Sequence, residues 1–293
     1  MDSFNLLRYT VGTAMLNNAK IKLDIHKDTR ELLDSNNTVF VASNHKSMWE
    51  TAGLPVTIHK EFNKKIVSGA GQALFKGLSK KIMNLGTTFN IEKDKKTSAL
   101  SLIEEISKKL DANNSMLVFP EGTRSRDGHL ANFKSSIFQA PLNTENKVYI
   151  IPADVTYPQI PELKLFDNNE KYSFSLKHVK YLLAKLDPVV VSLGEPLLNT
   201  DFQNRKELSD TTRQLAKELV HVHPTNIFAH AYKQNGTLTG DSIDNTINQL
   251  TEKTKKFTHL PYKSVVLNNT KVSLLAKESD LDFYANQISH YTK

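Results

Sequence analysis

The chain of 293 residues contains no cysteine. This absence excludes a disulfide framework, a zinc site built from thiolates and a cysteine nucleophile. Long apolar runs are also lacking: no stretch approaches the roughly 20 apolar residues that span a bilayer, so we expect no transmembrane segment. Residues 1–23 lack a cationic start and a continuous apolar core, so we do not interpret them as a signal peptide. They are weakly amphipathic and suit a helix that lies on a membrane or one that packs on the domain.

The charge balance is positive. Lysine and arginine together number 38, and aspartate and glutamate 31, which gives a net charge of +7. Such a balance suits an anionic partner, whether nucleic acid, acidic lipid or a phosphorylated substrate, and it equally suits a solvated lysine-rich surface. We find no nucleic-acid-binding motif and no pattern of stacking aromatic residues, so we expect no nucleic-acid partner.

Apolar runs of strand length alternate with segments of helical periodicity. The residues expected in strands are 38–42, 66–67, 87–91, 116–119, 148–151 and 189–193, and those expected in helices are 73–83, 97–110 and 201–220. Strands alternating with helices predict an α/β fold, with a mixed, largely buried sheet flanked by helices.

The composition changes after residue 220, where His221-Val-His223-Pro interrupts the helical pattern. We therefore expect a main domain over residues 1–220 and a small C-terminal extension over residues 221–293. Apolar residues at helical spacing predict a helix around residues 243–250. The sequence gives no indication of what the extension does, and we expect the two histidines to be ordinary surface residues.

Polar residues follow the first predicted strand directly, in the segment NHKSMWE. Sites in α/β sheets gather where a strand ends and the next helix begins. Ser47 and Glu50 have the spacing of a capping box, with Ser47 as the helix cap and Glu50 at the third helical position. Glu50 can then hydrogen-bond one imidazole nitrogen of His45 and leave the other free to take a proton from a hydroxyl. The alternative is that Glu50 only caps the helix and that His45 is a turn residue. The segment alone does not separate the two.

A second polar segment, PEGTRSR, follows the strand expected over residues 116–119. Pro120 ends the strand, and Gly122 permits a tight turn. Thr123 and the backbone amides can donate to an anion, and Arg124 can grip a phosphate with its planar guanidinium. The alternative is a polar turn with solvated arginines. A base after one strand and anion donors after another are what acyl transfer to a phosphate-bearing alcohol requires.

Together these segments resemble the glycerolipid acyltransferase family, best known from the lysophosphatidate acyltransferases. The first family block, Asn-His-x-Ser-x-x-Asp, stands here as residues 44–50, and the third block, Phe-Pro-Glu-Gly-Thr-Arg-Ser, is complete over residues 119–125. Weaker matches are residues 86–93 for the second block, 133–140 for a Phe-Lys segment in which Ser136 replaces glycine, and 148–152 for the fourth block. The resemblance covers residues 39–155 and, more weakly, 191–196, but not the C-terminal extension.

The resemblance implies that His45 is the general base and that Glu50 orients it. The substrate-binding residues that it implies are Lys93, Glu121, Gly122, Thr123, Arg124 and Lys134. Two positions depart from the family pattern. Glu50 stands where the family usually has Asp, and the extra methylene must be absorbed by a shifted turn. Lys93 stands where the family has Arg, which keeps the charge but loses the bidentate fork.

The resemblance also implies the partners. The acyl donor would be acyl-CoA or acyl carrier protein, and the acceptor a phosphate-bearing glycerolipid, foremost lysophosphatidate. No metal or other cofactor is needed for that reaction. We expect the protein on the cytoplasmic face of a membrane, peripheral or monotopic. Lysines 60, 64, 65, 76, 80 and 81 suit a face that meets anionic lipid, and they equally suit a solvated helix face. The open alternatives are a sister enzyme that uses glycerol 3-phosphate or another lysophospholipid, and a catalytically silent lipid-binding relative.

Overall fold

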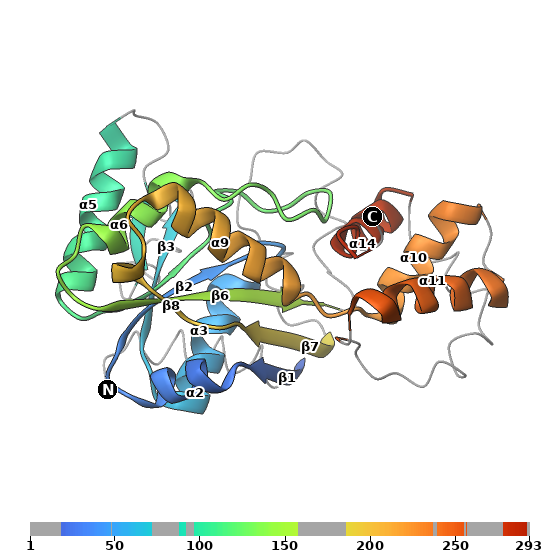
Figure 1. Cartoon of the computed structure of the whole chain (residues 1–293), viewed down its shortest axis with the longest axis horizontal. Coiled ribbons are helices and arrows are strands. Elements are labelled where there is room, and N and C mark those ends of the chain that lie inside the picture. Colours follow the sequence, from blue (N-terminus) through green and yellow to red (C-terminus); the bar gives the residue numbers. More distant parts are fainter. Residues whose placement is uncertain are drawn as a thin grey trace, which may run out of the picture.

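The computed structural model describes residues 19–47, 49–71, 88–91, 97–157, 186–236, 239–254, 256 and 278–291. Over these residues the chain forms an α/β fold, with one eight-stranded sheet between layers of helices (Figure 1). The mixed sheet flanked by helices that the sequence predicts is therefore confirmed. The helix expected over residues 73–83 lies outside the described residues.

The sheet combines parallel and antiparallel pairs. Its strands are β1 (Ala19–Ile25), β2 (Thr38–Ser43), β3 (Ile66–Gly71), β4 (Thr88–Ile91), β5 (Ser115–Val118), β6 (Val148–Thr156), β7 (Leu186–Leu193) and β8 (Leu197–Leu198). Their order is β1-β7-β6-β2-β5-β3-β4, and β8 pairs with β6. The strands β6, β2, β5, β3 and β4 are mutually parallel, whereas β7 runs antiparallel to β6 and parallel to β1. The carboxyl ends of the five parallel strands therefore meet at one edge of the sheet.

Helices cover both faces of the sheet. The described helices are α2 (Lys27–Asp34), α3 (Trp49–Phe62), α5 (Thr97–Asp111), α6 (Gln139–Leu142), α9 (Arg205–Glu218), α10 (Pro224–Asn235), α11 (Gly240–Lys253) and α14 (Glu278–Gln287), with short 3₁₀ turns at Ser135–Phe138 and Asn199–Asp201. The helices α2 and α3 pack on one face, and α5, α6 and α9 pack on the other. The helices α10, α11 and α14 gather beyond the end of the sheet (Figure 1).

The alternation of side chains along β2 separates the two layers of the core. Val39 and Val41 point into the cluster that includes α2 and α3, and Phe40 and Ala42 point into the cluster that includes α5 and α9. All four side chains are fully buried. Because both faces of β2 are covered, this strand is a continuous apolar run rather than an alternation of apolar and polar residues.

The strand β6 is longer than the sequence predicts, because it continues through Pro152 to Thr156. Proline lacks the N–H of a sheet ladder and is normally confined to edges or irregularities. Here the carbonyl of Pro152 accepts from Gly194 N at 2.8 Å. A residue in a strand points its N–H and C=O to the same side, so the missing N–H faces the turn at Gly194, between β7 and β8. The hydrogen bonds to β2 are therefore not interrupted.

The expectation that His221 and His223 are surface residues is wrong. Both are buried, with 4% and 0% of their surface exposed. They lie where the chain passes from α9 to α10 beside the sheet, and His221 Nε2 lies 2.8 Å from Asp24 Oδ2. Burial lowers the pKa of His223 to about 3, which keeps it neutral at neutral pH. The segment is polar but not exposed, because it packs against β6, where the amide of His221 donates to Thr156 Oγ1.

Candidate active site

The site lies at the carboxyl edge of three neighbouring parallel strands. His45 follows β2, Phe119 follows β5, and Tyr157 follows β6. Adjacent parallel strands bring their carboxyl ends together, which is the usual place for a binding crevice in an α/β sheet. The amide of Ser125 donates to the carbonyl of His45 at 2.7 Å, and so joins the loop after β5 to the turn after β2. The two polar segments of the sequence are therefore in direct contact.

The structure contains the predicted hydrogen bond between the imidazole and the carboxylate. His45 Nδ1 lies 3.0 Å from Glu50 Oε2. The Glu50 side chain is fully buried, whereas 17% of the His45 side chain is exposed. An ionised carboxylate can only accept, so the proton of a neutral His45 ring lies on Nδ1, and Nε2 carries the lone pair that can accept a proton. This is the tautomer that a general base needs.

Several donors besides His45 satisfy the buried carboxylate of Glu50. The backbone amides of Lys46 and Ser47 donate to it at 3.1 and 2.8 Å, and the hydroxyl of Tyr157 donates to Oε1 at 2.9 Å. Burial of an unpaired carboxylate is costly, and these bonds offset that cost while they fix the direction of the oxygens. Glu50 is therefore held from several sides as it contacts the imidazole.

The longer side chain at position 50 still reaches the imidazole. The helix α3 is assigned from Trp49, which places Glu50 in its first turn, and the side chain folds back to the amide of Ser47. This contact is the acidic half of the capping box that the sequence predicts at Ser47. The Glu50 carboxylate therefore contacts both the amide of Ser47 and the imidazole, although the side chain is one methylene longer than the family's usual Asp.

The imidazole is also held by an aromatic ring. The rings of His45 and Phe119 stack with their centroids 4.1 Å apart and an angle of 18° between their planes. Stacking on one face and a hydrogen bond at Nδ1 together limit rotation of the ring. The loop that begins at Phe119 therefore helps to orient the histidine as well as lying beside it.

Glu121 links the two segments through its carboxylate. One oxygen accepts from the amide of His45 at 2.8 Å, and the other accepts from the amide of Ala131 at 2.9 Å. Burial raises the pKa of Glu121 to about 7, although these two hydrogen bonds and the nearby charge of Lys46 act to lower it. Because both oxygens bind backbone amides, Glu121 would shape a substrate pocket by holding the loop and not by contacting a substrate directly.

The rest of the predicted anion site lies on the same loop. Gly122 has a positive φ of 72°, and a side chain at this position would overlap the ammonium end of Lys134. The amide of Lys134 donates to the carbonyl of Pro120 at 2.9 Å, which holds Lys134 beside the start of the loop. Thr123 is exposed and Arg124 is half-buried. Thr123 and Arg124 thus lie on the loop that the amide of Ser125 joins to His45, and Lys134 lies against Gly122 of the same loop.

Lys93, the remaining predicted phosphate ligand, lies outside the described residues, and its role stays a prediction. The strand β4, which precedes it, ends at the same edge of the sheet as β2 and β5.

Sequence reasoning missed a buried ion pair behind the histidine. Lys46 Nζ lies 3.0 Å from Asp154 Oδ1, and both side chains are almost fully buried. Asn44 also donates to Asp154, and so does Thr156. The signal in the sequence was Asp154 itself, because a charged residue inside an apolar strand indicates a buried partner. Tyr157 was missed as well, since its contact with Glu50 spans more than a hundred residues.

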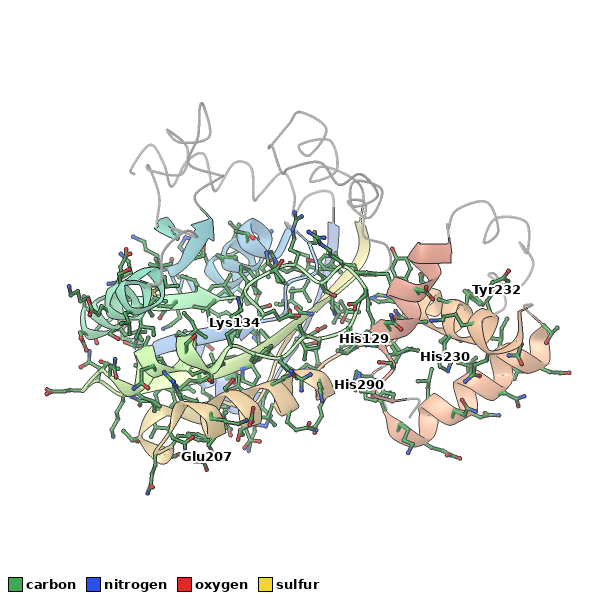
Figure 2. The ribbon with its side chains drawn as sticks, turned by 90° about the horizontal axis from the view of Figure 1, so that it is seen from above. His129, Lys134, Glu207, His230, Tyr232 and His290 are labelled. Atoms are coloured by element: carbon green, nitrogen blue, oxygen red, sulfur yellow. The ribbon has the colours of Figure 1, made fainter. Side chains whose placement is uncertain are left out.

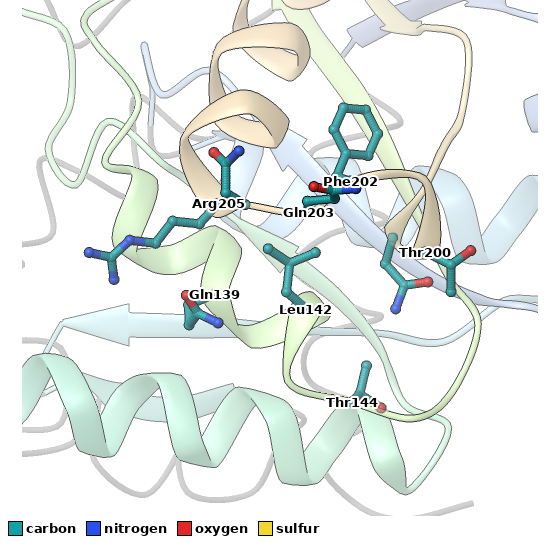
Figure 3. Close-up of a pocket in the computed structure, with 9 residues that line it drawn as sticks. Gln139, Leu142, Thr144, Thr200, Phe202, Gln203 and Arg205 are labelled. Carbon is teal, nitrogen blue, oxygen red and sulfur yellow. The ribbon is translucent and has the colours of Figure 1, made fainter.

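A cavity of about 420 Å³ lies away from this site (Figure 3). It is lined by residues that precede β6 or follow β8, among them Thr144, Asn199 and Arg205. The amino end of β6 is opposite the edge that holds His45, so this cavity does not belong to the predicted site.

In the part of the chain that the structure describes, no helix is both long and apolar enough to cross a bilayer.

A partly exposed imidazole that a buried carboxylate holds beside a polar loop is an arrangement that can act as a general base toward a hydroxyl.

The chain is similar to known proteins over this region. The Acyltransferase family profile matches residues 24–156, from the end of β1 to the end of β6. Human 1-acyl-sn-glycerol-3-phosphate acyltransferase beta is 28% identical over 127 residues, which cover 43% of this chain and 44% of the human protein. The match thus spans less than half the length of that relative.

A solved structure has the same fold. The crystal structure of the 1-acyl-sn-glycerophosphate (LPA) acyltransferase PlsC from Thermotoga maritima superposes with a TM-score of 0.50 at 16% identity, and the match covers 74% of this chain and 79% of that chain. Residues 24–156 thus match the Acyltransferase family profile, within a fold that the solved PlsC structure shares.

Proposed function

We propose that the protein transfers a fatty acyl group from a thioester, acyl-CoA or acyl carrier protein, to a hydroxyl of a phosphate-bearing glycerolipid such as lysophosphatidate. The observation that carries this proposal is the hydrogen bond between His45 Nδ1 and Glu50 Oε2, 3.0 Å long, beside the loop that begins at Phe119. The family of the domain and the name of the human relative support the reaction class.

In the first step His45 Nε2 takes the proton from the acceptor hydroxyl as its oxygen attacks the thioester carbonyl carbon. Glu50 stabilises the imidazolium that forms, because its carboxylate stays within hydrogen-bonding distance of Nδ1. The carbonyl oxygen becomes an oxyanion, which backbone donors at the site would stabilise.

In the second step the tetrahedral intermediate breaks its carbon–sulfur bond. The thiolate leaves with the proton that His45 Nε2 holds, so the products are an ester and a free thiol, and the imidazole is neutral again. The reaction involves no net oxidation. It is proton transfer and nucleophilic substitution at a carbonyl, and the proposal includes neither a metal nor another cofactor.

Positive side chains on the Phe119 loop would bind the acceptor phosphate. Arg124 can make a bidentate contact, and Lys134 lies against Gly122 on the same loop. Lys93 is the third proposed ligand. Since Glu121 holds this loop to the amide of His45, the phosphate site and the base are fixed relative to one another.

Access to a lipid acceptor favours a membrane surface, which we propose to be anionic and cytoplasmic. Lys60 and Lys65 are exposed at and just beyond the end of α3, and the net charge of +7 favours such a surface. Flotation with liposomes tests this part. Binding to the liposomes should increase with the fraction of anionic lipid and fall as the salt concentration rises. Binding that depends on neither would refute the proposed anionic surface.

The direct test is thiol release from palmitoyl-CoA, with lysophosphatidate and glycerol 3-phosphate tested side by side. We expect release with lysophosphatidate and a loss of about 10²–10⁴-fold in the variant His45→Ala, the usual contribution of a general base. The matched control is His230→Ala, because His230 lies on α10 among the C-terminal helices (Figure 2), where its ring contacts Gln234 of the same helix.

The outcomes of this assay separate the alternatives. Release with glycerol 3-phosphate alone would identify a sister acyltransferase. Release with neither acceptor would contradict the proposal and favour a silent lipid-binding relative. Release that survives His45→Ala would contradict the role of His45 as the base.

A further inference from the structure

The C-terminal helix α14 packs directly on the loop that holds the anion donors. Gly128, in that loop, has a positive φ of 83°, and a Cβ built there would overlap the carbonyl of Phe283 in α14. The two backbones therefore approach more closely than any residue with a side chain permits. Two features therefore require glycine at position 128: the positive φ angle and the close contact with the carbonyl of Phe283.

Two side chains of the C-terminal segment hold the loop on either side of Gly128. Asn286 Nδ2 donates to the carbonyl of Asp127 at 2.9 Å, and Ser289 Oγ lies 3.2 Å from His129 Nδ1. Figure 2 shows His129 at the junction between the loop and the C-terminal helices. Three consecutive loop residues are thus fixed by one helix and the turn that follows it.

The fixed segment is connected to the catalytic histidine through Ser125. Ser125 Oγ accepts from the amide of Gly128 at 3.0 Å and donates to the carbonyl of His129 at 3.0 Å. The amide of Ser125 donates to the carbonyl of His45 at 2.7 Å. One buried serine therefore joins the part of the loop that contacts α14 to the base, and the anion donors at positions 122–124 lie directly before it.

The helix α14 is itself well anchored. Phe283 and Tyr284 are part of the core cluster that contains β2 and β6, and Ile288 and Tyr291 are part of the cluster formed by α10 and α11. The carbonyl of Tyr284 also accepts from Asn226 Nδ2 in α10 at 2.9 Å. The helix packs into one core and the turn that follows it packs into the other, so the two together support the loop.

We propose that α14 positions the anion-binding loop, with Gly128 and Asn286 as positioning residues, and that the C-terminal extension is therefore part of the acyltransferase site. This inference rests on the proposed function of that loop. Neither residue contacts the reacting atoms. They act by keeping Thr123 and Arg124 at the distance from His45 that the acceptor phosphate and hydroxyl require.

The test compares pairs of variants in the full-length chain. Asn286→Ala removes an amide-to-carbonyl hydrogen bond to the loop, and Asn235→Ala removes one of the same length within α10, to Ala231. We expect Asn286→Ala to raise the KM for lysophosphatidate about fivefold, the effect of one hydrogen bond, with an unchanged KM for palmitoyl-CoA. Asn235→Ala should change neither.

A second pair uses the glycines. Gly128→Ala and Gly236→Ala place a side chain at similar positive φ angles, but a Cβ at Gly236 meets nothing within 4 Å. Gly128→Ala should raise the same KM at least as much as Asn286→Ala does, and Gly236→Ala should not. Equal kinetics within each pair would overturn the proposal, even if all four variants lost stability.

Hydrogen exchange distinguishes a failure of this inference from a failure of the proposed function, because it needs no turnover. Amides of the loop, from Gly122 to Gly128, should exchange about fivefold faster in Asn286→Ala than in Asn235→Ala. If the wild type releases no thiol but this difference is found, α14 supports the loop and the proposed function is wrong. If the two variants exchange alike, the positioning role is refuted whatever the activity.

Discussion

Tyr157→Phe removes one hydroxyl from the centre of the site. Tyr157 Oη donates to Glu50 Oε1 at 2.9 Å, and both side chains are fully buried. A hydrogen bond to a charged group contributes about 1.5–3 kcal/mol, and its loss removes one of the donors to Oε1. The amides of Lys46 and Ser47 remain, so we expect a loss of about 2 kcal/mol in the free energy of unfolding.

The same substitution should also slow turnover. With one of its donors gone, the carboxylate of Glu50 can shift relative to His45, and misplacement by about 1 Å costs up to about 10²-fold in rate. We expect kcat to fall about tenfold, within that range, with little change in the KM for either substrate.

Urea denaturation and thiol release check these two effects, with Tyr149→Phe as the control. Tyr149 is half-buried near the other end of β6. A shift in the urea midpoint at constant m would report stability alone. If Tyr157→Phe were as stable and as active as Tyr149→Phe, the account of how Glu50 is held would be refuted.

Two further changes test the groups around His45 and Glu50. Because burial raises the pKa of Glu121 from 4.5 to about 7, its contribution to stability is complete below pH 4.5 and is lost as pH rises through 7, by up to about 3 kcal/mol. Urea denaturation across this range should show that slope in the wild type and not in Glu121→Gln; equal slopes would contradict the assignment. Lys46→Met leaves Asp154 buried without its ion-pair partner, so thermal unfolding should show a loss of about 3–5 kcal/mol in the free energy of unfolding. The double variant Lys46→Met with Asp154→Leu should recover most of that loss. A double variant no more stable than the single one would argue against a buried ion pair.

Local patterns in the sequence predicted the strands that form the site. The apolar runs of β2, β5 and β6 are buried on both faces and stand out in the sequence. The polar residues after β2 and β5 meet because parallel neighbours end at the same edge. The contact between His45 and Glu50 also follows from spacing, since both belong to one turn and the helix after it.

Contacts between distant segments could not be predicted in this way. Tyr157 and Asp154 reach the site through the pairing of β6 with β2, which no local pattern specifies. The burial of His221 depends on how the extension docks beside the sheet, and the contact between Gly128 and Phe283 depends on the position of α14. Periodicity predicts which face of an element is apolar, but the partner of that face is set by tertiary packing.

The central claim is that the carboxylate at position 50 fixes the tautomer of His45 and so makes Nε2 the base. The most direct measurement compares kcat for thiol release in Glu50→Gln and Glu50→Asp. The amide of Gln can donate to Nδ1 and so move the ring proton to Nε2, and kcat should fall by up to about 10⁴-fold, as in triads with the wrong tautomer. The shorter carboxylate of Asp still accepts from Nδ1 and should keep much more of the activity. Full turnover in a folded Glu50→Gln protein would contradict the account.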